Sequence, residues 1–135
     1  VIVPMLSPKE VVLIRQHRHA IDKVIYEIPA GTREPKEPLL RCAKRELEEE
    51  TGYSARKWER LCDFYPAPGI STERMRLFRA SRLKRLEQPA AKDKDEYIAL
   101  EVVSASKAME LIRSNKILDA KSIIGLLLGL KRVRW

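Results

Sequence analysis

Short apolar runs, bounded by polar or Pro-containing segments, mark out the beginning of the chain. Val11–Ile14 and Val24–Ile28 are rich in β-branched residues and predict two strands, and Val1–Met5 predicts a further strand paired with the first of them. The segment Arg15–Lys23 between the two strands is polar and predicts a loop. The chain is therefore expected to open with strands rather than with a helix.

The segment Pro38–Thr51 predicts a helix with both ends marked. Its first residue is a proline, which a first helical turn tolerates, and Gly52 falls where a helix commonly ends. Leu40, Ala43 and Leu47 recur at spacings of three and four residues, as an apolar stripe on one helix face does. We expect this stripe to face a sheet.

The second half of the chain continues with strands and helices and contains no internal repeat. Ser104 and Asp119 have side chains that can cap a helix N-terminus. The predicted elements are the strands Arg56–Phe64, Arg74–Ala80 and Tyr97–Val103, the charged loop Lys84–Asp95, and helices from Ser104 to about Ser114 and from Asp119 through Leu130. This order of elements predicts a single α/β domain over residues 1–135.

Charge and composition narrow the class of protein. The chain has 27 Lys and Arg residues against 19 Asp and Glu, a formal charge of +8, but only 6% of its residues are aromatic. A nucleic-acid-binding surface combines basic with aromatic residues, so we expect no nucleic-acid partner. The longest apolar run, Ile123–Leu130, is too short to span a membrane. No export signal opens the sequence, so a cytoplasmic location is expected.

A cluster of acidic residues lies in the predicted helix of this otherwise basic chain. Glu46, Glu49 and Glu50 stand three and four residues apart, so their carboxylates share one arc of the helix. Such like charges destabilise a bare helix by ~0.2–0.5 kcal/mol per pair, and a bound cation reverses the sign. Carboxylate oxygens suit Mg²⁺ or Mn²⁺, which also bridge to phosphate oxygens. The alternative is a solvated acidic face relieved by Lys44 and Arg41.

The spacing around this cluster is more specific than the cluster itself. Gly31 is followed after five residues by Glu37, after seven more by Arg45-Glu46-Leu47, after one by Glu49-Glu50 and after one by Gly52-Tyr53. This pattern resembles the Nudix box with every specified position filled, and the chain is identified as a member of the Nudix hydrolase family. The resemblance implies an α/β/α sandwich around a mixed β-sheet. It also implies that Gly31 turns the chain beside a metal, where a Cβ would crowd it.

The resemblance assigns roles to residues of the box. Glu46 and Glu50 match the principal metal ligands, and Glu49 matches a third ligand or a carboxylate that positions water. The backbone carbonyl of Ala30 matches a position that completes the metal shell. Arg45 matches a residue that holds the carboxylates by charge-assisted hydrogen bonds. The implied cofactor is Mg²⁺, with Mn²⁺ as an alternative.

Segments outside the box resemble the ADP-ribose pyrophosphatase branch of this family. The matching segments are Arg15–Arg18, Glu27–Gly31, Pro68-Gly69, Ile70–Glu73, Asp95–Ile98 and Ile117–Ala120. By this likeness Arg18, Glu27, Pro68 and Glu73 are substrate-binding residues, and Arg18 would bind a phosphate or the terminal ribose. The implied substrate is a nucleoside diphosphate sugar, ADP-ribose first, which would yield AMP and ribose 5-phosphate.

The catalytic base is assigned to the loop before the late strand, where this branch usually carries it. Glu96 is the first candidate and Asp95 and Asp93 follow. Lys94 stands where some relatives carry another acid, so Glu49 remains a rival for this role.

The branch implies a homodimer in which an N-terminal segment is exchanged and contacts adenine. Only about ten residues precede Val11 here, so Tyr26, Trp58 or Tyr65 would have to supply those contacts. Two other functions stay open. One is hydrolysis of oxidised nucleotides or dinucleoside polyphosphates, and the other is a non-catalytic nucleotide- or nucleic-acid-binding Nudix module, which only the +8 charge supports.

Overall fold

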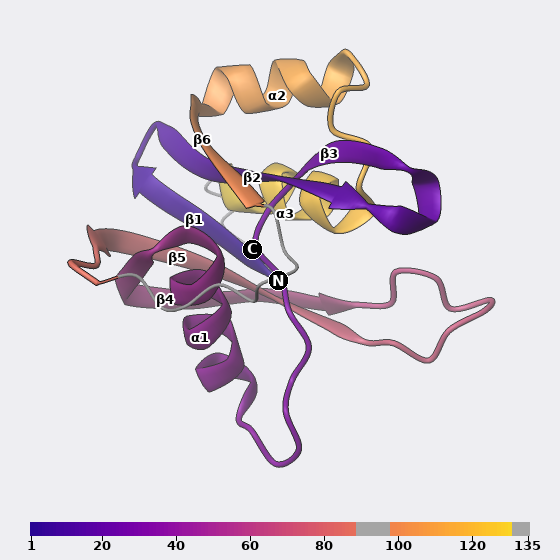
Figure 1. The fold of residues 1–135 in the computed structure, drawn as a ribbon, viewed down its shortest axis with the longest axis horizontal. Coiled ribbons are helices and arrows are strands. Elements are labelled where there is room, and N and C mark those ends of the chain that lie inside the picture. The colour runs from indigo at the N-terminus through magenta and orange to yellow at the C-terminus, as the bar shows by residue number, and fades with distance from the viewer. Residues whose placement is uncertain (89–97, 131–135) are drawn as a thin grey trace.

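The computed structural model describes residues 1–88 and 98–130, which form a mixed six-stranded sheet with three helices (Figure 1). In chain order the elements are β1 (Ile2–Ser7), β2 (Glu10–Arg18), a 3-10 turn (His19–Ile21), β3 (Lys23–Glu27), α1 (Leu39–Thr51), β4 (Tyr53–Phe64), β5 (Met75–Arg85), β6 (Ile98–Ser104), α2 (Ala105–Arg113) and α3 (Ala120–Leu130). The predicted α/β class is confirmed.

Strand β1 joins the two halves of the sheet. It pairs antiparallel with β2, where Met5 faces Val11, and parallel with β5, where Ile2 faces Phe78. The strand order is β3-β2-β1-β5-β4, and β6 pairs with β2. The predicted pairing of the first strand with the second is therefore correct, and the parallel contact makes the sheet mixed.

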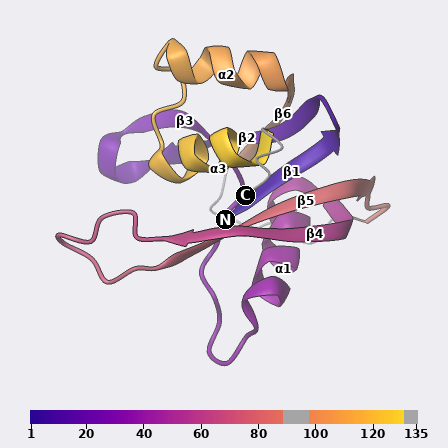
Figure 2. The ribbon, with the colours of Figure 1, turned by 180° about the vertical axis from the view of Figure 1, so that it is seen from behind.

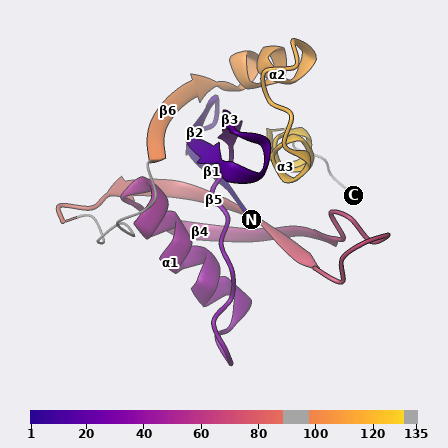
Figure 3. The ribbon, with the colours of Figure 1, turned by 45° about the vertical axis from the view of Figure 1, so that its right-hand side comes forward.

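The side chains of β1 alternate between two cores on opposite faces of the sheet. Ile2 packs with Ala43 and Leu47 of α1, whereas Val3 packs with Leu126 of α3. Figure 3 shows α1 on one side of the strands and α2 and α3 on the other. Because a strand directs successive side chains to opposite faces, this alternation produces the three-layer sandwich.

Helix α1 occupies the predicted segment, but its apolar stripe is displaced. Gly52 ends the helix in the left-handed conformation with φ of 69°, and its N–H donates to the carbonyl of Glu48. Leu47 is fully buried, as predicted, but Leu40 is 39% exposed, so its predicted place in the stripe is wrong. Leu39 packs against the core on the α1 side instead, because helix α1 begins at that residue.

Two predicted loops are partly strands. Strand β2 runs on to Arg18 and pairs with β3 through residues that were predicted to form a loop, such as His17 opposite Val24. Strand β5 continues to Arg85, which faces Tyr53. Both extensions are polar. They are therefore stabilised by hydrogen bonds to neighbouring strands rather than by burial of apolar side chains. Figures 1 and 2 show the β4–β5 hairpin extending beyond the rest of the molecule.

The last two helices begin at the predicted caps. The Oγ of Ser104 accepts the N–H of Lys107 at 3.1 Å, and Asp119 Oδ2 accepts the N–H of Ser122 at 3.0 Å. Within the described part of the chain, no helix combines the length and apolar character needed to cross a bilayer.

Helix α3 lies unusually close to β1 at Gly129. A Cβ at this glycine would lie 2.8 Å from Cγ1 and 3.1 Å from Cβ of Val3, whose β-branched side chain has little freedom to move. A cost of ~1–3 kcal/mol for overpacking outweighs the gain of about 1 kcal/mol in helix propensity. The Gly129→Ala variant should therefore unfold in urea with a free energy of unfolding up to about 2 kcal/mol below that of the unmodified chain.

Gly69→Ala is the matched control, because a Cβ at Gly69 meets no atom within 4 Å. Its free energy of unfolding should change by less than about 0.5 kcal/mol. Equal stability of the two variants would show that α3 does not need this close approach.

Candidate active site

Arg45 gathers three carboxylates at the surface of α1. Its Nη1 donates to Glu46 Oε1 at 2.8 Å and to Glu49 Oε2 at 2.9 Å. Its Nε and Nη2 donate to the two carboxylate oxygens of Glu37 at 3.2 and 3.1 Å. The hydrogen bonds from Arg45 lower the pKa of Glu37, and those to Glu37 raise the pKa of the guanidinium. A single cation thus offsets repulsion among these acids.

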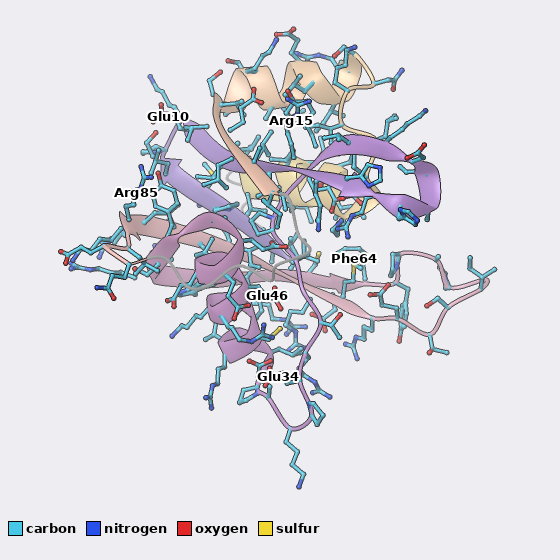
Figure 4. All side chains as sticks on the ribbon, in the orientation of Figure 1. Glu10, Arg15, Glu34, Glu46, Phe64 and Arg85 are labelled. Atoms are coloured by element: carbon cyan, nitrogen blue, oxygen red, sulfur yellow. The ribbon has the colours of Figure 1, made fainter. Side chains whose placement is uncertain are left out.

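The chain segment after β3 lies against the same carboxylates. A Cβ at Gly31 would lie 1.8 Å from the carboxyl carbon of Glu46, so the glycine leaves room for this carboxylate in its present position. The N–H of Ala30 donates to Glu50 Oε2 at 3.0 Å, and Glu50 is 6% exposed. Figure 4 labels Glu46 beside this segment, with Glu34 at the far end of the loop. The backbone of residues 30 and 31 and two carboxylates of α1 therefore share one small volume.

The oxygen atoms of these residues are of the kind that a hard divalent cation binds. Glu46, Glu49 and Glu50 supply carboxylate oxygens, and Ala30 supplies a backbone carbonyl close by, as Mg²⁺ and Mn²⁺ prefer. Among residues 1–88 and 98–130, no group of three or more Asp, Glu, His or Cys side chains is arranged so that it could hold a metal ion. In this arrangement the guanidinium of Arg45 supplies the positive charge at Glu46 and Glu49.

A cleft of roughly 640 Å³ opens beside Glu46. It joins residues from β1, β2, β5, α1, α3 and the loop after β3, so no single segment of sequence contains it. Among the described residues, its charged lining residues are Arg18, Arg33, Glu46, Glu73, Arg74, Arg76 and Lys121. Cations outnumber carboxylates in this described part of the lining, which suits an anionic ligand.

Two predicted substrate-binding residues, Arg18 and Glu27, form an ion pair whose carboxylate is buried and whose guanidinium lines the cleft. Arg18 donates from Nε and Nη2 to the two oxygens of Glu27 at 2.5 and 2.7 Å. Glu27 is 1% exposed, whereas Arg18 remains 41% exposed by its side chain and lines the cleft. Glu27 therefore lies behind Arg18 and orients it, while Arg18 faces the space that a ligand would occupy.

Lys121 is a third member of this network, and the sequence analysis did not identify it. Its Nζ donates to Glu27 Oε2 at 2.5 Å and lies 3.0 Å from Asp119 Oδ2. It lines the cleft although it is 9% exposed. A signal was present, because a cation in the first turn of a helix opposes the helix dipole and implies a nearby carboxylate.

The remaining predicted site residues lie in different places. Glu73 lines the cleft, whereas Pro68 lies in an exposed turn and is not among the described residues that line the cleft. Glu96, the first candidate base, lies outside the described residues, as do Asp93 and Asp95. The structure therefore brings together residues of β2, the box and β5, but it does not place the predicted base loop.

The three aromatic candidates for adenine contacts have other surroundings. Tyr26 donates its hydroxyl to Glu101 at 3.0 Å, and Trp58 packs edge-on against Phe78 in the core. Tyr65 is 55% exposed. None of these three residues is among those that line the cleft in the described part of the chain.

Comparison with known proteins identifies the family. Residues 1–123 match the model of the NUDIX domain. The chain belongs to the Nudix family. The motif spacing from Gly31 to Tyr53 therefore predicted the family correctly.

Curated proteins similar to this chain include one whose name agrees with the predicted branch and two with other names. The chain is 37% identical to an ADP-ribose pyrophosphatase of Bacillus subtilis over 84% of this chain and 61% of the relative. It is 35% identical to a methanol dehydrogenase activator of Bacillus methanolicus over 91% and 66% of the two chains. It is 35% identical to a GDP-mannose pyrophosphatase of Cronobacter sakazakii over 86% and 64%.

The chain spans less than two thirds of the length of these curated relatives. A solved structure titled as an ADP compounds hydrolase shares the fold with a TM-score of 0.84 and 24% identity, covering 94% of this chain and 67% of that one. Together these similarities confirm the resemblance to the ADP-ribose pyrophosphatase branch and the Nudix sandwich.

Removal of Lys121 from this Nudix chain should change the pH dependence of unfolding. Burial raises the pKa of Glu27, but hydrogen bonds from Arg18 and Lys121 outweigh it and hold the pKa below its ordinary value. The stability linked to this carboxylate is therefore present at neutral pH and is lost as pH falls through the lowered pKa. Lys121→Met should lower the free energy of unfolding at pH 7 by about 1–3 kcal/mol and move acid unfolding to higher pH.

Urea titrations between about pH 3 and pH 8 would measure this shift. Lys107→Met is the control, because Lys107 makes the same kind of ion pair with Glu110 on an exposed surface. An acid-unfolding curve of Lys121→Met that overlays the control would contradict a stabilising role for the buried pair.

Proposed function

We propose that this chain hydrolyses the diphosphate bond of nucleoside diphosphate sugars with a divalent metal ion. One observation carries the proposal: Glu46, which lies among the gathered carboxylates of α1, lines the same cleft as Arg18 and Lys121. A diphosphate bound there would meet a metal-binding set on one side and fixed cations on the other.

The residues of α1 and the adjoining loop have distinct roles in this proposal. Glu46, Glu49, Glu50 and the carbonyl of Ala30 would hold Mg²⁺ or Mn²⁺. The bound ion would supply a positive charge that polarises a phosphoryl group and lowers the pKa of a water molecule bound to it. Arg45 keeps the carboxylates together, as its hydrogen bonds to Glu46 and Glu49 support.

Substrate contacts and proton transfer are assigned to residues around the cleft. Arg18 would bind a phosphate or the terminal ribose, since its guanidinium is oriented by Glu27 and faces the cleft. Glu73 lies in the same lining and would contact the substrate. The candidates for the base are Glu96, with Asp95 and Asp93 next, and their rival Glu49, which is 36% exposed by its side chain.

ADP-ribose is the proposed substrate, with AMP and ribose 5-phosphate as products. The names of the relatives support this class, because both ADP-ribose pyrophosphatases and GDP-mannose pyrophosphatases are similar to this chain. A homodimer stays a prediction from family likeness, and a cytoplasmic location stays a prediction from the sequence.

A substrate panel tests the reaction class. With Mg²⁺ present, the purified protein should release AMP from ADP-ribose with a higher kcat/KM than it hydrolyses ADP-glucose, diadenosine polyphosphates or nucleoside triphosphates. GDP-mannose belongs in the same panel because of the named relatives. Preference for triphosphates or dinucleoside polyphosphates would move the chain to another branch of the family. Oligonucleotide binding without hydrolysis of any diphosphate would favour the non-catalytic alternative.

The Glu50→Gln variant tests the metal site. The amide keeps the size of the side chain but removes the charge beside Ala30, so the fold should survive while metal affinity and turnover fall by about 10–100-fold or more. Activity and the Mn²⁺ dissociation constant, followed by electron paramagnetic resonance, would measure both effects.

Glu48→Gln is the matched control for this variant. Glu48 lies in the same acidic run of α1, but it stands two residues from Glu46 and from Glu50, which places it on another face of the helix. This variant should keep both activity and Mn²⁺ affinity. Wild-type turnover of Glu50→Gln at saturating Mg²⁺ would exclude Glu50 as a ligand.

A further inference from the structure

Most of the charged residues at the cleft fall into three groups with different charge balances, and Arg33 and Glu73 also line it. In the α1 group, Arg45 is the one guanidinium among Glu37, Glu46 and Glu49, with Glu50 close by, so the group is strongly negative. The second group is the buried network at Glu27, in which two cations face two carboxylates and cancel. The third group lies on the β4–β5 hairpin and is positive.

We call this third group the Asp63 cluster, and it consists of Asp63, Arg60, Arg74 and Arg76. Arg76 donates from Nε and Nη2 to the two oxygens of Asp63, both at 2.8 Å, and Arg74 donates from Nη2 at 2.7 Å. Arg60 lies 3.3 Å from the same carboxylate. Three guanidinium groups share one carboxylate, so the Asp63 cluster keeps two positive charges.

The register of β4 and β5 builds the Asp63 cluster. Asp63 stands directly opposite Arg76, and Arg74 and Arg76 are two residues apart, which places them on the same face of the chain. An irregularity between Arg60 and Cys62 in β4 shifts the alternation and allows Arg60 to reach Asp63 as well. In Figure 4 the labelled Phe64, the next residue after Asp63, marks this end of β4.

Asp63 orients the arginines rather than neutralising them. Its side chain is 10% exposed, and hydrogen bonds from Arg76 hold its pKa far below the usual range, so it stays ionised. Arg74 is 58% exposed by its side chain, and in the described part of the chain it gives one Nη2 hydrogen bond to a protein carboxylate. Most of its N–H donors therefore remain available to a ligand.

Arg74 and Arg76 both line the cleft that contains Glu46, whereas Arg60 is not among the described residues that line it. Arg74 and Arg76 share the single carboxylate of Asp63, and a diphosphate held beside the α1 carboxylates by a metal ion does not cancel their remaining positive charge. Oriented guanidinium forks match phosphate oxygens in both charge and geometry. The cleft therefore has a place for an anionic group in addition to the diphosphate.

We propose that Arg74 and Arg76 of the Asp63 cluster form a subsite for a phosphate monoester that the substrate carries in addition to its diphosphate. The inference rests on the proposed function, because that function places the diphosphate beside α1. The phosphate would sit on either the nucleoside or the sugar end of a nucleoside diphosphate sugar. Arg74 and Arg76 would donate to it, and Asp63 would hold both arginines in position.

Three compounds distinguish the two ends: ADP-ribose, its 2′-phosphate on the adenosine ribose, and its 1″-phosphate on the terminal ribose. Calorimetric titrations in EDTA measure binding without hydrolysis, and kcat/KM values with Mg²⁺ measure turnover. We expect one of the phosphorylated compounds to bind about tenfold or more tightly than ADP-ribose. The compound that does so identifies the end that carries the phosphate.

The Arg74→Gln variant tests whether the Asp63 cluster causes this preference. It should reduce the ratio of affinities for phosphorylated and unphosphorylated compound by about tenfold, and Arg76→Gln should do the same. Arg60→Gln is the matched control, since it removes the same charge from the same carboxylate outside the cleft lining. This control should leave the ratio unchanged.

The outcomes separate this inference from the proposed function. If neither phosphorylated compound binds more tightly than ADP-ribose, or if Arg74→Gln weakens all three compounds equally, the subsite is overturned while hydrolysis of ADP-ribose stands. If ADP-ribose is not hydrolysed but the Arg74-dependent preference in EDTA persists, the proposed function fails and the subsite stands. If Arg60→Gln and Arg74→Gln reduce the ratio equally, the preference is a long-range charge effect and the subsite is overturned.

Discussion

The position of β1 between two other strands is the constraint on which the rest of the structure depends. Its backbone pairs with β2 on one side and with β5 on the other, and it directs apolar side chains to both faces, so both faces must be covered. Ile2 accordingly packs toward α1 and Val3 toward α3. The N–H of Ile2 also donates to the carbonyl of Pro29 at 2.8 Å, which ties the loop before Gly31 to the central strand. The core thereby sets the distance between the loop and the carboxylates of α1.

Electrostatics at the site follow from this placement. A helix that carries Glu46, Glu49 and Glu50 on one arc accumulates negative charge, and Arg45 compensates only part of it. The other side of the cleft has the opposite sign, because Arg74 and Arg76 outnumber their shared partner Asp63. A cleft with an acidic side and a basic side suits a ligand that combines a metal ion with phosphate groups.

Prediction from the sequence succeeded where the signal was local. The helix from residue 38 to 51 ends at Gly52, and the last helices begin after Ser104 and Asp119, because caps and positive-φ glycines act within a few residues. Prediction failed where stability came from distant partners. Residues 15–18 were predicted to form a loop because they are polar, but pairing with β3 on one side and β6 on the other makes them strand.

The sequence by itself determined the family and the acidic set, because the Nudix box records both as fixed spacings along one helix and one loop. Only the tertiary structure decided which cations face these acids. Lys121 lies 94 residues from Glu27, and Arg74 lies 11 residues from Asp63 across a hairpin. Such pairs depend on strand register and helix docking, which are set by the packing of the whole sheet rather than by the residues that make the contact.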